Sequence, residues 1–258
     1  MPSAPLRVWR ERDGRLLRVR LARPKANVIN EEMIEALDAL FADARVREAP
    51  AIRAVLLDAE GPHFSFGASV EEHLPATCAG MLKSLHQLVL RMLEFPVPIL
   101  VAIRGQCLGG GLEVTLAGHL LFAAPGASLG QPEIVLGVFA PAASCLLPER
   151  IGPAAAEDLL LSGRSIDGQE ALRLGLVTAV ADDPEAAALA WFDEHLAKRS
   201  ASSLGFAVRA ARIGLVERVR TKLAALEELY LAGLMSTRDS VEGLTAFLEK
   251  RPARWEDR

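Results

Sequence analysis

Several features are scarce or missing in this 258-residue sequence, and each of these shortages argues against a class of protein. Its three cysteines, Cys78, Cys107 and Cys145, are an odd number with no CxxC pair, which argues against a disulfide scaffold or a zinc site. The first fourteen residues lack the apolar core of a signal peptide. Positive charge is not in excess either: 29 Lys and Arg accompany 33 Asp and Glu, whereas nucleic-acid binders are usually basic. We therefore expect a soluble, cytoplasmic protein without nucleic acid or metal. Because 51% of the residues are hydrophobic, a disordered chain is excluded.

Charged residues are also missing from one long segment. They make up 24% of the chain, yet residues 105–148 contain only Glu113 and Glu133. Residues 114–132 carry no charge, but Pro125-Gly126 interrupts the run, which argues against a membrane span. We expect this segment to cross the protein core. An ionised carboxylate is costly there unless it is paired or hydrogen-bonded.

Strand patterns begin the chain. Residues 6–12 and 15–21 flank Asp13-Gly14, which is a hairpin turn signal. In the second arm, apolar residues alternate with Arg18 and Arg20, which predicts a strand with one buried face. Two short apolar runs predict strands that are covered on both faces, residues 52–57 and 98–103.

Helical patterns fill most of the remainder. Asn30 is a predicted N-cap for a helix over residues 31–44, and Asp183-Pro184 predicts another helix start. Apolar residues also recur at helical spacing over residues 81–93 and at Leu223, Leu226, Tyr230 and Leu234. We predict a core domain over residues 1–199. A helical module over residues 200–258 would pack on the core or on a neighbouring subunit.

Two familiar sequence motifs are matched only in part, and we reject both. Residues 126–130 match GxSxG, but the nucleophile elbow needs a helix directly after the turn, and Pro132 follows instead. Gly109-Gly110-Gly111 lacks the last glycine of GxGxxG, because residue 114 is valine. The five histidines show no metal-ligand spacing.

Two segments predict free backbone N–H donors. Ser69 and Glu72 form a capping-box pattern, so we expect a helix to begin just after Ala68. Residues 109–111 follow an apolar strand and open a second predicted helix. The first N–H groups of a helix lack partners within the helix, so they can stabilise a negative charge.

Two carboxyl groups complete the arrangement. Glu113 lies in the second predicted helix, and Glu133 lies beside Pro132. Two carboxyls in apolar surroundings, next to free N–H groups, can transfer protons beside a stabilised oxyanion. The alternative is a structural role, in which both glutamates pair with Arg104, Arg150 or backbone amides.

These residues resemble the crotonase (enoyl-CoA hydratase/isomerase) superfamily. The resemblance rests on five segments in the right order: RPKANVIN at 23–30, FxxGA at 64–68, GxxLGGGxE at 105–113, GQPEI at 130–134 and FLEKR at 247–251. It implies an α/β fold of the ClpP/crotonase type, a spiral of ββα units with a C-terminal helical module. It also implies a homotrimer or homohexamer that takes an acyl-CoA substrate. No cofactor is implied, since CoA enters as part of that substrate.

The resemblance also implies roles for individual residues. The N–H groups of Ala68 and Gly110 would form an oxyanion hole for the thioester carbonyl. Glu113 would activate water, and Glu133 would supply a proton to the carbon α to the carbonyl. The implied binding residues for CoA and the acyl group are Lys25, Ala26, Phe66, Ser69, Gly109 and Phe139.

The sequence departs from the common family pattern in three places. Ser69 replaces the usual aspartate, Phe66 replaces a small residue, and a glycine-rich stretch is replaced over residues 138–145. FSFGASVEEHLP at 64–75 with APAAS at 140–144 is similar to the cyclohexa-1,5-diene-1-carbonyl-CoA hydratases. Their implied product is 6-hydroxycyclohex-1-ene-1-carbonyl-CoA. The alternatives are a straight-chain enoyl-CoA hydratase and a non-catalytic protein of this fold that binds acyl-CoA or RNA.

Overall fold

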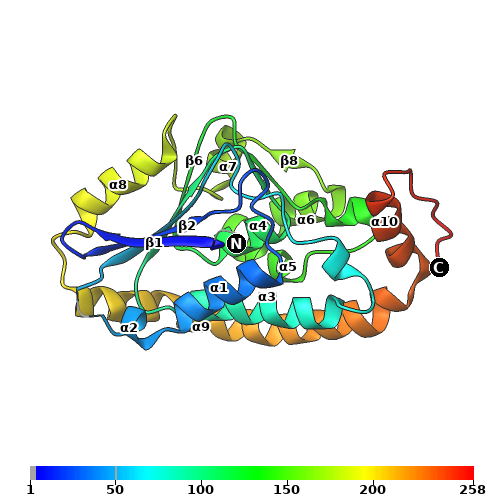
Figure 1. Ribbon diagram of the computed structural model, residues 1–258, viewed down its shortest axis with the longest axis horizontal. Helices are drawn as coiled ribbons and strands as arrows, with labels where there is room; N and C mark the ends of the chain where they lie inside the picture. Colours follow the sequence, from blue (N-terminus) through cyan, green and yellow to red (C-terminus); the bar gives the residue numbers. More distant parts are fainter. Residues whose placement is uncertain (1–3, 50) are drawn as a thin grey trace.

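A twisted mixed sheet forms the centre of the protein (Figure 1). The computed structural model describes residues 4–49 and 51–258, so the first three residues of the segment expected to lack a signal peptide lie outside it. The sheet has six strands in the order β1-β2-β3-β4-β6-β9, of which β1 is antiparallel to β2 and the others run parallel. Their bounds are Leu6–Glu11, Leu16–Leu21, Ala54–Ala59, Ile99–Ile103, Leu120–Ala123 and Ala179–Val180. The predicted α/β class is confirmed.

A smaller sheet and the helices surround this centre. The smaller sheet has the order β5-β7-β8, with bounds Gln106–Leu108, Ser128–Gly130 and Ser165–Ile166. The α-helices α1 to α10 span Glu31–Ala42, Ala44–Arg47, Cys78–Leu93, Gly110–Leu116, Pro141–Ile151, Pro153–Ser162, Gly168–Leu174, Pro184–His195, Ala201–Glu228 and Arg238–Leu248. Shorter turns are η1 Glu71–His73, η2 Pro132–Leu136, η3 Leu229–Gly233 and η4 Leu234–Ser236.

Most elements predicted from sequence are present, with shifted ends. The hairpin forms, and its two strands pair along their whole length around Gly14, whose φ is 81°. The Asn30 side chain accepts a hydrogen bond from the Met33 N–H and starts α1, which ends two residues earlier than predicted. The Asp183 side chain likewise caps α8. Ser128 begins β7 and no helix follows it directly, which agrees with rejecting the nucleophile elbow.

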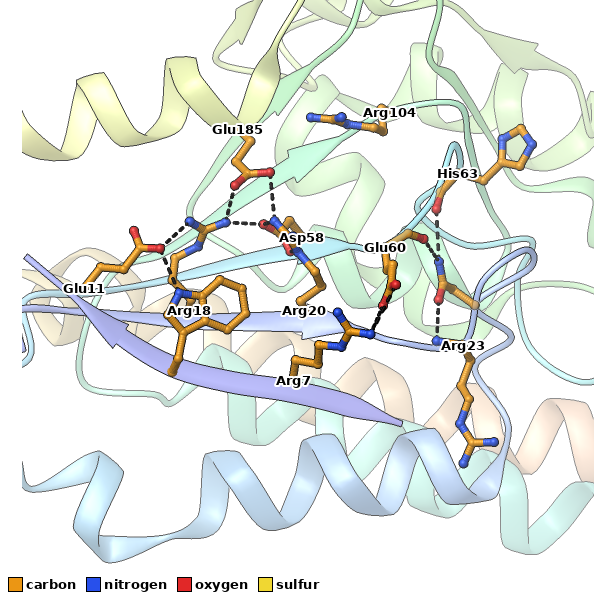
Figure 2. Close-up of polar contacts among 12 residues, drawn as sticks. Arg7, Glu11, Arg18, Arg20, Arg23, Asp58, Glu60, His63, Arg104 and Glu185 are labelled. Atoms are coloured by element: carbon orange, nitrogen blue, oxygen red, sulfur yellow. Dashed lines mark hydrogen bonds and ion pairs between the residues drawn. The ribbon is translucent and has the colours of Figure 1, made fainter. Parts of the chain in front are cut away.

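The prediction of one buried face for β2 is wrong. Helix α8 covers the face of the sheet on which Arg18 lies, and the Arg18 side chain is only 3% exposed. Arg18 donates hydrogen bonds to Asp58 at 2.5 Å and to Glu185 at 2.6 Å, as Figure 2 shows. Arg20 also binds Asp58, through Nε and Nη2. The arginines alternate with apolar residues because they meet carboxylates on the second face, not water.

The C-terminal segment packs on the rest of the chain. In Figure 1, α9 runs beside α3 along one side of the molecule, and α10 lies at the end near the C-terminus. Leu223, Tyr230 and Leu244 join the principal hydrophobic core. The boundary predicted at residues 199 and 200 stays a prediction. Within the described residues, no helix combines the length and the apolar character needed to cross a membrane.

Candidate active site

A largely apolar cavity of about 410 Å³ lies where the motif segments meet. Its walls come from η1, η2, α10 and the segments that precede η1 and α4. The lining residues are Phe66, Gly67, Ala68, Val70, His73, Leu108, Gly109, Pro132, Glu133, Val135, Leu136, Val138, Leu244 and Phe247. Only His73 and Glu133 in that set carry polar side chains. The cavity therefore suits an apolar group that needs few but specific polar contacts.

The backbone at Ala68 lies against the first turn of α4. A Cβ atom built on Gly110 would lie 3.1 Å from the Ala68 N atom and 2.9 Å from the Ala68 Cβ. Any larger residue at position 110 would therefore push the two segments apart. Within the described chain, neither the Ala68 N–H nor the Gly110 N–H donates a hydrogen bond to a protein acceptor. Two free donors thus lie side by side at the cavity.

The predicted helix after Ala68 is wrong. The Ser69 hydroxyl accepts a hydrogen bond from the Glu72 N–H at 3.4 Å, but only the three-residue turn η1 follows, and the α-helix starts at Cys78. The Glu72 carboxylate is not available for a capping box, because it accepts hydrogen bonds from the Glu31 N–H. Ala68 instead forms an isolated parallel bridge with Ile29, in which the Ile29 N–H donates to the Gly67 carbonyl and the Ala68 N–H donates to no described residue.

Glu113 lies in α4 and is 3% exposed. Its Oε1 accepts a hydrogen bond from the Ala143 N–H at 2.9 Å, at the start of α5. Burial raises the pKa of Glu113 to about 7, while N–H groups of Ala143 and Ala142 act in the opposite direction. Of the proposed structural partners, Arg104 binds Asp183 and Arg150 binds backbone carbonyls of α4 and Gly118. Glu113 is thus held by backbone amides and by no cation in the described residues.

Glu133 lies in η2 with its carboxylate beside Gly109. A Cβ atom on Gly109 would come within 2.7 Å of Oε1, and Gly109 has a φ of 49°, so glycine is needed there. Burial, together with the negative charge of Glu113, raises the pKa of Glu133 to about 8. With its side-chain amide turned to donate, Gln131 reaches both Glu133 oxygens at 3.0 Å.

The remaining predicted binding residues occupy different places. Phe66 lines the cavity, is 47% exposed and packs edge-to-face on His63. The Ala26 carbonyl accepts a hydrogen bond from the Phe66 N–H at 2.9 Å, and Lys25 next to it is exposed. The Ser69 hydroxyl donates to Glu71, outside the cavity lining. Phe139 also lies behind the lining, where its ring packs edge-to-face on Tyr230.

Several residues at the site were not predicted from the sequence. His73 lines the cavity but was read as an isolated histidine without a metal-like spacing. Leu244 and Phe247 come from α10, more than a hundred residues away from Glu133. Tyr230 is fully buried, and its hydroxyl has no partner in the described residues. Only Tyr230 gave a signal, because it is the single tyrosine in the chain and lies on a helical stripe.

Comparisons with known proteins agree with this geometry. Residues 11–258 match the family described as enoyl-CoA hydratase/isomerase. The chain is 68% identical over 256 residues to a cyclohexa-1,5-dienecarbonyl-CoA hydratase from Thauera aromatica, covering 99% of this chain and 98% of the relative. It is 34% identical to a crotonyl-CoA hydratase from Syntrophomonas wolfei, covering 94% and 95%.

Solved structures give the same result for the fold. An enoyl-CoA hydratase/isomerase from Pseudoalteromonas atlantica superimposes with a TM-score of 0.84 at 30% identity, covering 97% of this chain and 99% of that one. This confirms the crotonase fold that the motifs predicted. Four of the five segments that carry the resemblance contribute residues to the lining of the cavity, and the segment at 23–30 does not. The chain belongs to the enoyl-CoA hydratase/isomerase family of the crotonase superfamily.

Proposed function

We propose that this protein adds water to cyclohexa-1,5-diene-1-carbonyl-CoA. One observation carries the proposal: Glu133 lines an apolar cavity beside two free backbone N–H groups, and a second buried carboxyl, Glu113, lies close enough for its charge to act on Glu133, with no cation beside either in the described residues. That set can activate water, move a proton and stabilise an oxyanion. The 68% identity to a hydratase of that name supports the choice of acyl group.

The two carboxyls differ in a way that assigns their roles. Glu113 receives hydrogen bonds from the first turn of α5, which stabilise its ionised form. The charge of Glu113 disfavours the ionisation of Glu133 and raises its pKa. Near neutral pH the pair therefore holds one proton, mostly on Glu133. Glu113 is the general base and Glu133 the general acid.

The reaction then proceeds by conjugate addition. Glu113 takes a proton from water while the water oxygen bonds to ring carbon 2, which is β to the thioester carbonyl. The electron pair of the C1–C2 double bond moves to the carbonyl oxygen. The N–H groups of Ala68 and Gly110 stabilise the resulting enolate oxygen. Their adjacency is what makes a shared acceptor position available to both.

The ring changes where the proton goes. The enolate is conjugated with the C5–C6 double bond, so it can be protonated at C1 or at C5. Protonation at C5 leaves a double bond between C1 and C6, and renumbering gives 6-hydroxycyclohex-1-ene-1-carbonyl-CoA. For this product Glu133 must deliver its proton across the ring to C5. This revises the expectation of protonation at the α carbon, which holds for straight-chain substrates.

The rest of the ligand would extend away from the cavity. We place the CoA moiety along Lys25 and Ala26, since the Ala26 carbonyl holds the Phe66 segment of the cavity wall. Phe66 would contact the ring directly, whereas Phe139 would act through Tyr230 and Ser69 through η1. The catalytic cycle as written needs no cofactor. A cytoplasmic homotrimer or homohexamer, with residues 200–258 at subunit contacts and over CoA, remains our prediction for the assembly.

A substrate comparison tests the proposal. The cyclic dienoyl-CoA and crotonyl-CoA are assayed side by side, and kcat/KM is compared. We expect the cyclic substrate to be preferred, with the 6-hydroxy product identified by NMR. A preference for crotonyl-CoA would assign the protein to straight-chain hydration. Binding of both thioesters without turnover would instead favour the non-catalytic alternative.

A further inference from the structure

His73 is the second polar side chain at the cavity, and the mechanism above does not use it. It ends the turn η1, five residues after Ala68. Glu133, the other polar side chain in the lining, is occupied with proton transfer. The His73 side chain is half-buried, so a ligand that fills the cavity would cover it and would have to satisfy its remaining polar atom.

The hydrogen bonding of His73 fixes which form of the ring faces the ligand. Its Nδ1 lies 2.7 Å from the Ser69 carbonyl oxygen. A carbonyl oxygen can only accept, so Nδ1 carries the hydrogen and donates it. Burial lowers the pKa of His73, which keeps the ring neutral near pH 7. In a neutral ring with Nδ1 protonated, Nε2 is an acceptor, and no described residue donates to it.

We infer that His73 is a specificity-determining residue, whose Nε2 accepts a hydrogen bond from a hydroxyl group on the acyl ring. This deepens the proposed function and rests on it. The unsaturated ring has no donor, whereas the hydrated ring has one hydroxyl. His73 therefore favours hydroxylated acyl groups over their unsubstituted counterparts, and acts on the product side of the reaction.

A matched pair of ligands tests this inference. Cyclohex-1-ene-1-carbonyl-CoA and its 6-hydroxy derivative differ only in the hydroxyl group. Their dissociation constants are measured in the Glu113→Gln background, in which turnover is slow and every residue that lines the cavity is retained. We expect the hydroxylated ligand to bind about 3- to 10-fold more tightly, as one neutral hydrogen bond allows.

Three variants of His73 separate the acceptor from the rest of the side chain. His73→Phe should abolish the preference by weakening only the hydroxylated ligand. His73→Gln, which can place an oxygen near the position of Nε2, should restore part of it. His73→Asn can keep the contact to Ser69, but its amide oxygen cannot reach the position of Nε2, so it should behave like His73→Phe.

A failure of this inference can be distinguished from a failure of the proposed function. Equal weakening of both ligands in His73→Phe, or an unchanged preference, would overturn the inference. Either result can occur while the cyclic dienoyl-CoA is still hydrated, so the proposed function would stand. If the cyclic dienoyl-CoA is not hydrated by the unaltered protein, the proposed function fails, whatever the preference of His73.

Discussion

Two buried acidic groups of this protein have opposite surroundings. Asp58 and Glu113 are each 3% exposed. Asp58 lies between Arg18 and Arg20, as Figure 2 shows, and both arginines also bind Glu185. Glu113 meets only backbone N–H groups, and its nearest charged neighbour of note is another carboxyl, Glu133. Equal burial therefore does not imply an equal role.

The electrostatic consequences run in opposite directions. Burial alone would lower the pKa of Arg18, but hydrogen bonds to Glu185 and Asp58 outweigh it and raise the pKa. Arg18 therefore keeps its positive charge at all ordinary pH values. Burial instead raises the pKa of Glu113 and Glu133 into the neutral range, where a proton can be gained or lost. The cluster around Asp58, in which each carboxylate is paired with arginines, joins α8 to the sheet. The pair of Glu113 and Glu133, which has no cation beside it in the described residues, is suited to proton transfer.

The largest effect is expected for turnover when either glutamate is changed. Glu113→Gln and Glu133→Gln should each lower kcat for hydration by about 10²- to 10⁴-fold, because each removes one proton-transfer group. The dissociation constant of the acyl-CoA should change little, since the amide fills the same space. Steady-state kinetics and calorimetric binding measure the two quantities. Unchanged turnover in both variants would show that Glu113 and Glu133 take no part in proton transfer, and they would then not differ in role from Asp58.

The second effect concerns stability on the compensated side. Asp58→Asn removes the buried one of the two carboxylates that Arg18 and Arg20 share, and should lower the free energy of unfolding by about 3 kcal/mol. The matched control is Asp193→Asn, which breaks the exposed pair with Arg12 and should cost less than about 1 kcal/mol. Urea denaturation of both variants measures the difference. Equal losses in the two variants would show that burial does not increase the contribution of an ion pair to the free energy of unfolding.

The third effect is the pH dependence of stability at the glutamates. The folded-state pKa of Glu133 lies above its ordinary value of 4.5, at about 8. The folded protein therefore binds the proton more tightly than the unfolded chain, and stability falls as the pH rises from about 5 to about 8. Glu133→Gln removes this penalty, so it should stabilise the protein at pH 9 and have little effect at pH 5. The gain is roughly 1.4 kcal/mol for each unit of pKa shift removed.

Thermal unfolding at the two pH values measures this third effect. Asp58→Asn is its control, because removing a compensated carboxylate should destabilise the protein at both pH values. If Glu133→Gln lowers the melting temperature at pH 9, a partner stabilises the Glu133 carboxylate in the folded protein, as the arginines stabilise Asp58.

Strands β1 to β4 and the caps at Asn30 and Asp183 could be predicted from sequence because their signals are local. Asn30 caps α1 through a hydrogen bond to a residue three positions away, and hydrophobic spacing locates β4. The burial of Arg18 could not be predicted, since it depends on α8, which follows more than 160 residues later. The helix expected after Ala68 failed because Glu31 competes for the Glu72 carboxylate, and that contact joins distant segments.

The site shows the same division between local and distant information. The family resemblance brought Ala68, Gly110 and the glutamates together as candidates, and the structure places Ala68 beside Gly110. Phe247 and Leu244 reach the cavity only through the path of the C-terminal helices. The amides that hold Glu113 belong to α5, whose start after Pro141 carried no recognised signal.

The smallest effect is expected at Tyr230, where a polar group is buried without a partner. Its hydroxyl has no hydrogen bond in the described residues, and its ring packs on Phe139. Tyr230→Phe should therefore raise the free energy of unfolding by about 1 kcal/mol, because an unsatisfied hydroxyl is removed from the core. Tyr230→Leu, which also removes the ring, should instead lower it by about 2 kcal/mol or more. A loss of stability in Tyr230→Phe would mean that the hydroxyl is already satisfied, and the region around the glutamates would then resemble the compensated cluster at Asp58.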